Sequence, residues 1–443
     1  MRRTKQIREG LRRWTAVLLV LAVTTMLAAC GERAKDDGKA PEKEPTSTVT
    51  TAPTQTPEDG SGTETLTAGS NAAPEKKAMD EAMRQAYADF SYRLFKECAQ
   101  GDDGNCVISP FSVYTALAML ANGAKGDTLT QMDTVLGLTA ETRNQYLAGW
   151  IASLTGQENV AFTCSDSVWI AKRFRTAVPD PFLSVCADYY MAEVFAADMD
   201  DRTVDDVNAW VDKNTKGMIK KIIKPGDLTI DTSVILMNAI TLDADWEIPF
   251  LLENTETDAE FTKADGTKTK VEMLRGEADR CFLENDMFTG CAKSYKGGKY
   301  RFVALLPKEG VTLDAAVAAL DQMTVDALFA NAKADAVSLR IPKITDEYKR
   351  ELNNVLSTMG MPDIFSIGAD FTGLIRTGQT FVDRVIHKTF LSLDNKGTRA
   401  AAVTFISTRT LSASRTHTIR LDRPFVYMIV DENNLPIFLG TYQ

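Results

Sequence analysis

The chain has 443 residues, of which 44% are hydrophobic and 25% charged, and its net charge at pH 7 is −10. These proportions are those of an ordinary globular protein, and the acidic balance argues against nucleic acid as a partner. A folded region of this length buries a large core without needing disulfides or a structural metal.

Residues 1–29 are predicted to be a signal peptide. A basic stretch, MRRTKQIREGLRR, precedes the apolar run WTAVLLVLAVTTMLAA, which is too short to predict a spanning helix. The run ends in Leu27-Ala28-Ala29-Cys30, which resembles the lipobox of bacterial lipoproteins. That resemblance implies cleavage before Cys30, a lipid on its thiol, and a position at the outer face of the bacterial cell membrane or cell surface, or outside the cell if the protein is shed. The alternative is an ordinary secretory signal peptide that contains a cysteine.

Residues 30–76 are predicted to form a flexible tether carrying the lipid anchor. The segment is rich in Thr, Pro and Glu and has almost no large apolar residues, so it cannot bury enough surface to offset chain entropy. The folded domain is predicted to span residues 77–443. It begins with a helix whose apolar residues recur at helical spacing, at Met83, Tyr87, Phe90 and Leu94.

Six cysteines remain once Cys30 is assigned to the lipid. An exported protein can form disulfides, and the short separations favour local bridges, whereas buried free thiols fit the sequence equally well. No C-x-x-C motif occurs, so neither a zinc site nor a dithiol redox site is expected, and no cofactor is predicted. The six are Cys98 and Cys106, Cys281 and Cys291, and Cys164 and Cys186.

The best-defined helix is predicted to follow Ser109, a capping residue, with Pro110 in its first position and Gly123 at its end. A second helix is predicted between Asp127 and Gly137. An amphipathic helix farther along carries Val207, Trp210 and Val211.

Strands dominate the later part of the chain. The run 233–242, SVILMNAITL, is almost continuously apolar, which predicts a strand covered on both faces. Shorter strand-like runs follow at 301–307 and 338–344, and residues 423–440 have the pattern of a hairpin with DENN as its turn. Because helices cluster early and strands late, the predicted fold class is α+β.

No catalytic signature is present. The chain has two histidines and lacks the nucleophile-elbow, zinc-protease, dinucleotide and phosphate-loop motifs. His387 lies in the apolar stretch FVDRVIHKTF and is predicted to be a hydrogen-bonded core residue, while His417 is predicted to be exposed in a polar loop. The basic segment 216–224 is either a solvated face or a polyanion site. The protein is therefore not predicted to be an enzyme.

The folded region resembles the serpins over about residues 78–443. The resemblance implies a monomeric domain with three β-sheets, about nine helices and an exposed reactive-centre loop. It is carried by blocks that occur in the family's order: ISPFSVYTALAML, GAKGDTLTQM, VNAWVDKNTKGMI, LMNAITLDADW, RIPKI, LNNVLSTMGMPDIF, ADFTGL, VIHKTFLSLDNKGTRAAAVT and LDRPFVYMIVDENNLPIFLG.

The resemblance gives residues 395–416, NKGTRAAAVTFISTRTLSASRT, the role of a protease bait. In inhibitory serpins a serine protease attacks this loop and forms an acyl-enzyme. The cut loop then enters the main sheet as an extra strand before the ester is hydrolysed. The implied function is irreversible, suicide-type inhibition of serine endopeptidases.

The alternation of this segment is compatible with insertion, because successive strand residues face opposite ways. From Thr398 the inward series contains no charge and runs Thr398, Ala400, Ala402, Thr404, Ile406, Thr408 and Thr410. Both arginines fall on the other face, which holds Arg399, Ala401, Val403, Phe405, Ser407 and Arg409. The predicted hinge comprises Gly397, Thr398, Arg399, Ala400, Ala401, Ala402, Val403 and Thr404. Two positions, Asn395 and Arg399, depart from a Glu that is usual in the family.

Family spacing from the hinge glycine predicts Leu411-Ser412 as the scissile bond. A leucine before the cut suits elastase-, chymotrypsin- or subtilisin-like proteases, whose primary pockets are apolar. The alternatives Arg409-Thr410 and Arg415-Thr416 suit trypsin-like enzymes, whose pocket holds a carboxylate, and papain-like cysteine proteases are a further target class.

The resemblance also implies a hydrogen-bonded latch where the main sheet parts. Its predicted members are Ser109, Ser112, Asn238, Trp246 and His387. Ordinary hydrogen bonding of buried polar groups explains the same residues equally well. Two other functions remain open: a non-inhibitory serpin-fold binding protein on the cell surface, and a solute-binding lipoprotein, for which two similar α/β halves would be needed and none is visible.

Overall fold

The computed structural model describes residues 62–68, 74–100, 104–155, 160–398 and 415–443. The chain divides into two units, Met1–Pro57 and Glu58–Gln443, and every described residue belongs to the second. The predicted signal peptide, the lipidation site Cys30 and most of the predicted tether therefore lie outside the described residues. Within the described part, no helix is long and apolar enough to cross a membrane.

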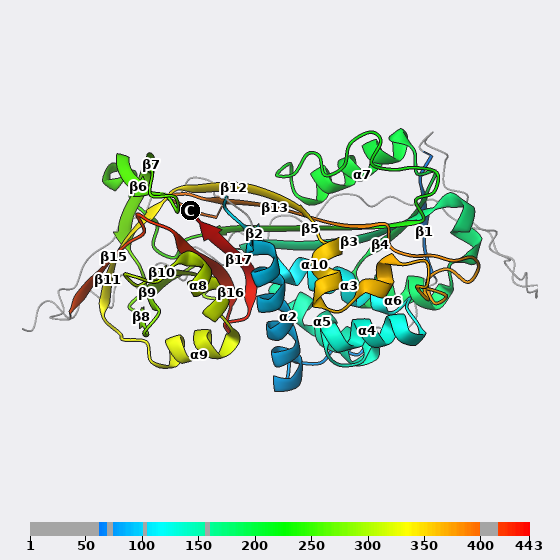
Figure 1. Ribbon diagram of the computed structural model, residues 1–443, viewed down its shortest axis with the longest axis horizontal. Coiled ribbons are helices and arrows are strands. Elements are labelled where there is room, and N and C mark those ends of the chain that lie inside the picture. Colours follow the sequence, from blue (N-terminus) through cyan, green and yellow to red (C-terminus); the bar gives the residue numbers. More distant parts are fainter. Residues whose placement is uncertain (1–61, 69–73, 101–103, 156–159, 399–414) are drawn as a thin grey trace, which may run out of the picture. The chain divides into compact units, whose positions relative to one another are not determined.

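Nine α-helices occur among the described residues, most of them on one face of a large sheet (Figure 1). The predicted cap at Ser109 is confirmed, because its side chain accepts a hydrogen bond from the Ser112 amide and Pro110 follows at the first helical position. The helices are α2 (Glu81–Ala99), α3 (Pro110–Ala121), α4 (Gly126–Leu136), α5 (Ala140–Leu154), α6 (Asp180–Tyr190), α7 (Asp201–Asn214), α8 (Leu313–Ala319), α9 (Gln322–Ala330) and α10 (Asn353–Met359).

The strands form three sheets. The main sheet has seven strands, in the spatial order β1 (Glu64–Leu66), β4 (Glu193–Ala197), β3 (Val160–Ala171), β5 (Val234–Asp245), β14 (Gly397–Thr398), β13 (Arg384–Leu393) and β12 (Ile344–Glu351). The second sheet has six, in the order β2 (Val107–Ile108), β17 (Pro436–Tyr442), β16 (Phe425–Asp431), β10 (Tyr300–Pro307), β9 (Phe288–Ser294) and β8 (Phe282–Glu284). The third has four, in the order β15 (Thr416–Arg420), β11 (Ala336–Pro342), β7 (Lys268–Glu277) and β6 (Glu256–Thr262).

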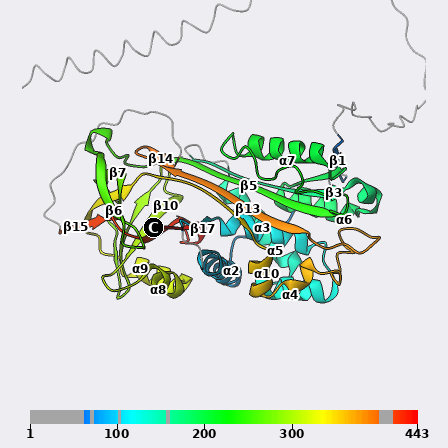
Figure 2. The ribbon, with the colours of Figure 1, turned by 45° about the horizontal axis from the view of Figure 1, so that its top comes forward.

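The central strand β5 is covered on both faces, as its apolar run predicts. Ile235 and Met237 pack in a core with α7, which lies across one face of the main sheet (Figure 2). Leu236, Ile240 and Leu242 point the other way, into the larger core shared with α3, α5 and the second sheet. Alternate residues of one strand therefore serve two cores.

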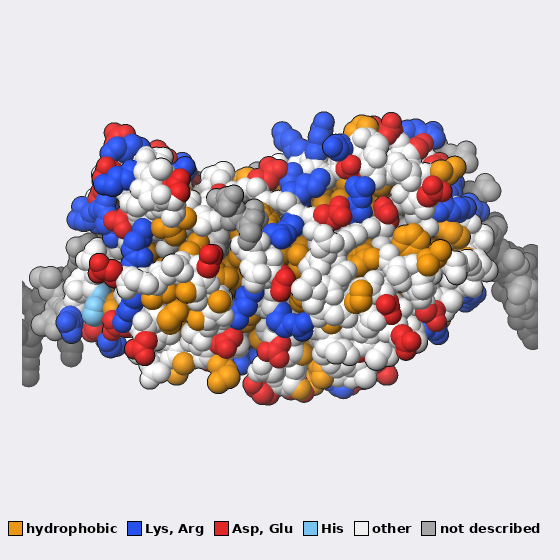
Figure 3. All heavy atoms as spheres, viewed as in Figure 1, with side chains coloured by type: hydrophobic (Ala, Val, Ile, Leu, Met, Phe, Trp, Pro, Cys, Tyr) orange, Lys and Arg blue, Asp and Glu red, His pale blue; other side chains and the backbone are white. Residues whose placement is uncertain are grey.

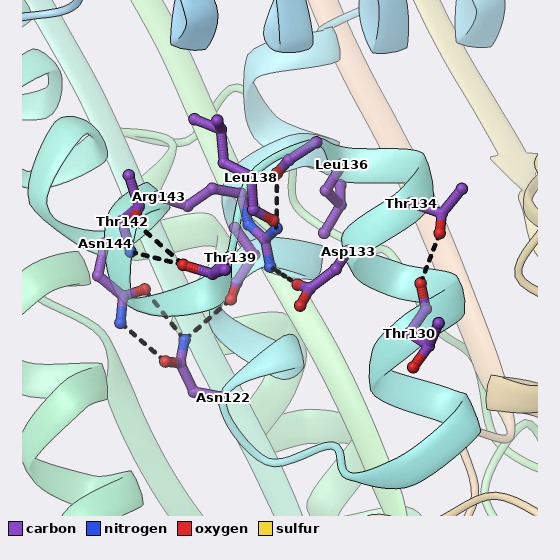
Figure 4. Close-up of polar contacts among 12 residues, drawn as sticks. Asn122, Thr130, Asp133, Thr134, Leu136, Leu138, Thr139, Thr142, Arg143 and Asn144 are labelled. Atoms are coloured by element: carbon purple, nitrogen blue, oxygen red, sulfur yellow. Dashed lines mark hydrogen bonds and ion pairs between the residues drawn. The ribbon is translucent and has the colours of Figure 1, made fainter.

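A buried polar cluster joins the helices beneath the main sheet (Figure 4). The Arg143 side chain of α5 is fully buried, donates to the carbonyls of Gly137 and Leu138, and pairs with Asp133 of α4 at 2.8 Å. Removing one partner of such a pair would leave a buried charge uncompensated. The cluster therefore holds α4 against α5 beneath the main sheet.

The predicted tether ends earlier than expected. Residues 64–66 form β1, which pairs antiparallel with β4, Thr65 lying opposite Phe195. Glu64 also pairs with Arg175 at 2.8 Å. Backbone groups at a free sheet edge accept a strand of almost any sequence, because the ladder bonds involve only the main chain. Composition therefore does not reveal this strand.

Four cysteines of the folded unit, Cys164, Cys186, Cys281 and Cys291, are free thiols, and all but the partly exposed Cys281 are buried. The predicted local bridge between Cys281 and Cys291 is therefore not formed. Of the two alternatives that the sequence leaves open, free thiols is the one that the structure has for these four residues.

Candidate functional site

The predicted bait loop leaves the main sheet through β14. Gly397 and Thr398 lie between the ends of two long strands, Thr398 opposite Ala244 of β5 and opposite Leu393 of β13. The tight turn before them is held by the Asp394 carboxylate, which accepts from the amides of Lys396 at 2.8 Å and Gly397 at 3.3 Å. The first two hinge residues are thus already part of the sheet.

Gly397 is required by close approach rather than by an unusual backbone angle. A Cβ at this position would lie 2.0 Å from the Ala244 carbonyl oxygen, and its φ is outside the left-handed region. Gly397, the first residue of the predicted hinge, therefore lets one strand end pass tightly beside another.

Thr398 faces the main core, as the predicted alternation requires. Its side chain is buried, and its hydroxyl shares a 2.6 Å hydrogen bond with the Tyr295 hydroxyl. Tyr295 in turn stacks on Trp246, with ring centroids 4.4 Å apart. The Trp246 indole N–H donates to the Asp394 carbonyl, so this aromatic pair supports the root of the loop.

Beyond Thr398, the main sheet has an open seam between β5 and β13. The two strands pair directly only at Arg384 opposite Ile235 and Val385 opposite Leu236. In the described strands, residues 237–242 of β5 have no ladder partner on this side. On its other edge β5 is paired without interruption to β3. We call the unpaired stretch between β5 and β13 the seam.

Four of the five predicted latch residues meet beneath the seam. The Ser109 amide donates to His387 Nε2 at 3.1 Å, and the Ser112 hydroxyl donates to Asn238 Oδ1. The Ser112 amide also donates to the Ser109 hydroxyl, which links the two halves. Asn238 on β5 and His387 on β13 stand on opposite sides of the seam and are joined through α3. Trp246 does not belong to this group, since it lies at the root of the loop.

Burial in this group keeps His387 neutral. The loss of hydration lowers the pKa of His387 to about 4. A neutral imidazole has one acceptor nitrogen, which here accepts from the Ser109 amide. The prediction of a hydrogen-bonded core histidine is confirmed.

Asp166 of β3 is a member of this network that sequence reasoning missed. Its Oδ1 accepts from the Asn238 amide at 2.6 Å, and the Cys164 thiol lies 3.9 Å from Oδ2. The side chain is almost fully buried, and burial raises the pKa of Asp166 to about 7, against the opposing effect of the Asn238 hydrogen bond. A signal was available: Asp166 is a lone carboxylate at an inward position of an apolar strand.

Lys293 at the loop root was also missed. Its ammonium donates to the Glu277 carbonyl at 2.7 Å and lies 4.6 Å from the centroid of the Phe250 ring and 5.6 Å from that of Trp246. Burial lowers the pKa of Lys293 to about 8. A buried cation is thus enclosed by the aromatic residues that support the loop.

The basic segment 215–224, which follows α7, crosses the outer face of the main sheet, and we call it the strap. Lys349 of β12 donates to the Ile222 carbonyl at 2.6 Å, and Lys388 of β13 donates to the Lys221 carbonyl at 2.7 Å. Lysine side chains gather on its outer surface (Figure 3), and they are exposed in Lys216, Lys220, Lys221 and Lys224. Of the two readings of this segment, the geometry favours a solvated face on a structural connection.

Two predictions at the other end of the loop change. His417 lies in β15 rather than in an exposed loop: it is partly buried, bonds Asp335 at 2.8 Å and stacks on Phe282 at 3.7 Å. The alternative cleavage point Arg415-Thr416 coincides with the start of this strand, where Thr416 pairs with Ala336 of β11.

The other predicted cleavage residues, Arg409, Thr410, Leu411 and Ser412, lie outside the described residues, as does the hinge from Arg399 to Thr404. Their roles stay predictions. Residues that could ligate a metal do not cluster in the described part of the chain.

A family model described as Serpin (serine protease inhibitor) matches residues 85–443, and the chain belongs to this family. The α+β serpin fold with three sheets is thereby confirmed.

Particular members can be compared with it. Alpha-1-antiproteinase of Callosciurus caniceps is 30% identical over 367 residues, which cover 80% of this chain and 86% of the relative. The thermophilic serpin tengpin in its native state is 35% identical, with a TM-score of 0.77 over 85% of this chain and 97% of that one. Thyroxine-binding globulin in complex with thyroxine is 26% identical, with a TM-score of 0.73 over 81% of this chain and 98% of that one. Membership therefore supports a protease-inhibitor kind of function, in a family whose fold also serves ligand binding.

Proposed function

We propose that this protein is an irreversible suicide-type inhibitor of serine endopeptidases and has no catalytic activity of its own. It traps the acyl-enzyme by inserting the cleaved segment, about residues 397–411, into the seam. The observation that carries the proposal is the seam itself: a gap in the main sheet whose first two places are already filled by β14.

The register of β14 specifies where each following residue would go. Thr398 lies opposite Ala244 and Leu393. Continuing both antiparallel ladders brings Thr404 opposite Asn238 on one side and His387 on the other. The latch therefore stands at the point that Thr404, the sixth residue after Thr398, would approach, and insertion would separate Asn238 from His387 and close the seam.

The side chains suit these positions. Ala400 would lie between Leu242 and Leu391, and both of these core residues are buried. A charge there would cost several kcal/mol without a partner. Arg399 would take the opposite face, beside Asp243 of β5, so the arginine that departs from the family's pattern would meet a carboxylate rather than the core.

The chemistry follows from the order of events. The protease serine attacks the Leu411 carbonyl, an ester forms, and the amine of Ser412 leaves with the C-terminal part of the loop. Each residue that then enters the seam forms ladder hydrogen bonds, worth about 0.5–1.5 kcal/mol each. The strap would have to move at the same time, because it shares a core with Ile235 and Met237 of β5 and is hydrogen-bonded to Lys349 of β12 and Lys388 of β13.

Leu411 as the residue before the cut favours elastase-, chymotrypsin- or subtilisin-like targets. Cleavage at Arg409-Thr410 would favour trypsin-like enzymes, and papain-like proteases are a further class. Cleavage at Arg415-Thr416 is disfavoured, since Thr416 is held in the ladder of β15.

A lipid on Cys30 would display this monomeric inhibitor at the outer face of the cell membrane. β1 pairs with β4, and the row of paired residues that contains Thr65 continues through Phe195 of β4 and Trp169 of β3 to Ile235 of β5. The row that contains Thr398, the last described residue before the loop, includes Ala244 of β5. At about 3.3 Å per residue these rows are about 30 Å apart along β5. β1 thus lies at the end of the main sheet opposite β14, and we expect a chain that enters at β1 to leave the root of the loop uncovered.

The second candidate is a non-inhibitory binding protein, favoured by the similarity to thyroxine-binding globulin. A panel of pancreatic elastase, chymotrypsin, subtilisin and trypsin separates the two. An inhibitor forms a covalent adduct that survives a denaturing gel, and mass spectrometry of the released peptide locates the cut. Turnover by every protease without an adduct would favour the binding protein.

A matched pair of variants tests insertion itself. Ala400→Arg puts a charge on the inward face, and we expect it to convert the inhibitor into a substrate. Ala401→Arg puts the same side chain on the face that already carries Arg399, and adduct formation should persist. Equal behaviour of the two variants would contradict insertion in this register.

A further inference from the structure

The connection between β5 and β6 exposes an unusual amount of apolar surface. Seven large hydrophobic side chains are exposed in the described part of the chain, and three of them lie within five residues here: Ile248 (45% exposed), Leu251 (45%) and Leu252 (66%). The other four, Met191, Ile230, Met323 and Ile367, are isolated along the chain. We call the three together the apolar shelf. Single exposed hydrophobic residues need no explanation, but clustered ones mark interaction surfaces.

The shelf is a rigid feature rather than a frayed loop. Phe250 is buried between its exposed neighbours and packs edge-on against Trp246, with ring centroids 6.1 Å apart. Gly276 of β7 makes room for it, because a Cβ there would lie 2.7 Å from the Phe250 ring. The Asn254 amide then donates to the Leu251 carbonyl at 3.0 Å, closing a short 3₁₀ turn. Anchoring Phe250 inward obliges Leu251 and Leu252 to face solvent.

The shelf adjoins the root at which the bait loop leaves the body. Two amides of the same connection hold this root: Phe250 donates to the Asn395 carbonyl at 2.8 Å, and Trp246 donates to the Lys396 carbonyl at 2.7 Å. Farther along the chain, Glu256 of β6 lies 3.8 Å from Arg420, the last residue of β15. The connection that carries the shelf therefore borders the start of the loop and leads to a strand that contacts the far end of β15.

We propose that the apolar shelf is a docking surface for the body of the serine protease that attacks the loop. This inference rests on the proposed function and deepens it, since it adds a contact outside the scissile bond. The protease that binds the loop is the protein brought to this position, because the connection that carries the shelf holds Asn395 and Lys396 at the start of the loop. Glu247 and Glu253 are exposed at its rim, so the matching protease surface beside the catalytic cleft is apolar with basic groups around it.

Reversible docking can be measured apart from insertion. The probes are elastase, chymotrypsin, subtilisin and trypsin whose catalytic serine is replaced by alanine, so that the loop is bound but not acylated. The test variant is Leu251→Ser/Leu252→Ser. Its matched control is Met191→Ser/Ile230→Ser, which removes two exposed apolar side chains elsewhere. Because all four side chains are exposed, neither variant is expected to disturb folding, and thermal unfolding verifies this.

We expect at least one inactive protease to bind the test variant about tenfold more weakly than the unaltered protein, as loss of a central apolar anchor does. The control variant should bind each inactive protease as tightly as the unaltered protein does.

Equal affinity of the test variant and the unaltered protein for every probe, or binding of none, would overturn the proposal. A test variant that instead changes the sedimentation of the protein alone would assign the shelf to a second copy and overturn it as well. If docking depends on the shelf while active proteases only cleave the loop, the docking surface stands and the inhibitory function fails.

Discussion

The two edges of β5 differ in a way that its residues do not reveal. Toward β3 the strand is paired from Val234 to Ala244 without a break, whereas toward β13 residues 237–242 have no ladder partner in the described strands. Both edges belong to one strand with one apolar pattern, so hydrophobic burial cannot be the cause. The difference lies in the main-chain hydrogen bonds: β5 has a complete ladder toward β3 and an incomplete ladder toward β13.

The largest expected effect comes from completing the ladder on the β13 side of β5. Cutting the loop near Leu411 lets residues 399–405 pair on both edges, and ladder bonds of about 0.5–1.5 kcal/mol each add up to roughly 5 kcal/mol or more. For a domain of this size that raises the thermal midpoint by about 10 °C or more. Calorimetry of intact and nicked protein measures the shift. Identical midpoints would show that the seam does not take up the loop.

The second effect concerns the carboxylate beside the seam. The pKa of Asp166 is raised to about 7 from 3.8. A raised carboxyl pKa contributes stability that is complete below the unfolded value of 3.8 and is lost as the pH rises through 7. The two thiols that interact with Asp166, Cys164 and Cys186, also have raised pKa values, so they stay neutral and add no second negative charge.

Asp166→Asn keeps an acceptor for the Asn238 amide but cannot ionise. We expect the variant to be more stable than the unaltered protein at pH 8, by about 1–4 kcal/mol, and the gap to shrink toward pH 5. Thermal midpoints of both proteins from pH 5 to 8 measure this. A gap that is constant across the range would mean that Asp166 does not titrate in the folded protein.

The third effect tests how β14 is seated at the seam. Gly397→Ala places a methyl group 2.0 Å from the Ala244 carbonyl, and we expect a loss of about 1–3 kcal/mol as β14 is pushed aside. Gly104→Ala is the matched control, because a Cβ there would meet nothing within 4 Å and its φ lies outside the left-handed region. Hydrogen exchange of the Thr398 amide reports whether β14 stays paired. Unchanged protection would show that the backbone adjusts without losing the strand.

The smallest effect is expected at the outer edge of the sheet. Thr65→Pro removes a backbone donor from β1 and should lower the free energy of unfolding by about 1 kcal/mol or less, because β1 is a short edge strand. Adduct formation with proteases should be unaffected. An effect as large as that of Gly397→Ala would mean that the outer edge and the seam are coupled across β4, β3 and β5.

Some of the site is readable in the residues. The capped start of α3 at Ser109, the doubly covered strand around Asn238 and the alternation that points Thr398 into the core all follow from local rules of capping and strand geometry. These features hold because they depend on neighbours within a few residues. The order of the family's motifs extends this to the fold, since it carries the whole topology at once.

Other parts required the folded chain. Lys293 is a polar residue in an otherwise apolar strand, and only the packing of Trp246 and Phe250 shows that it is buried. His417 sits in a polar stretch, and pairing with β11 takes it into a strand.

Residue type and spacing are enough to identify the family and many of the elements, and they predict the face on which each loop residue would lie. Three features are visible only in the folded chain: β5 is paired on one edge and open on the other, Asp166 contacts Asn238, and the apolar shelf adjoins the start of the loop. Each of these depends on which distant segments become neighbours. Strand pairing is set by main-chain hydrogen bonds, whose donors and acceptors are the same whatever side chains stand beside them.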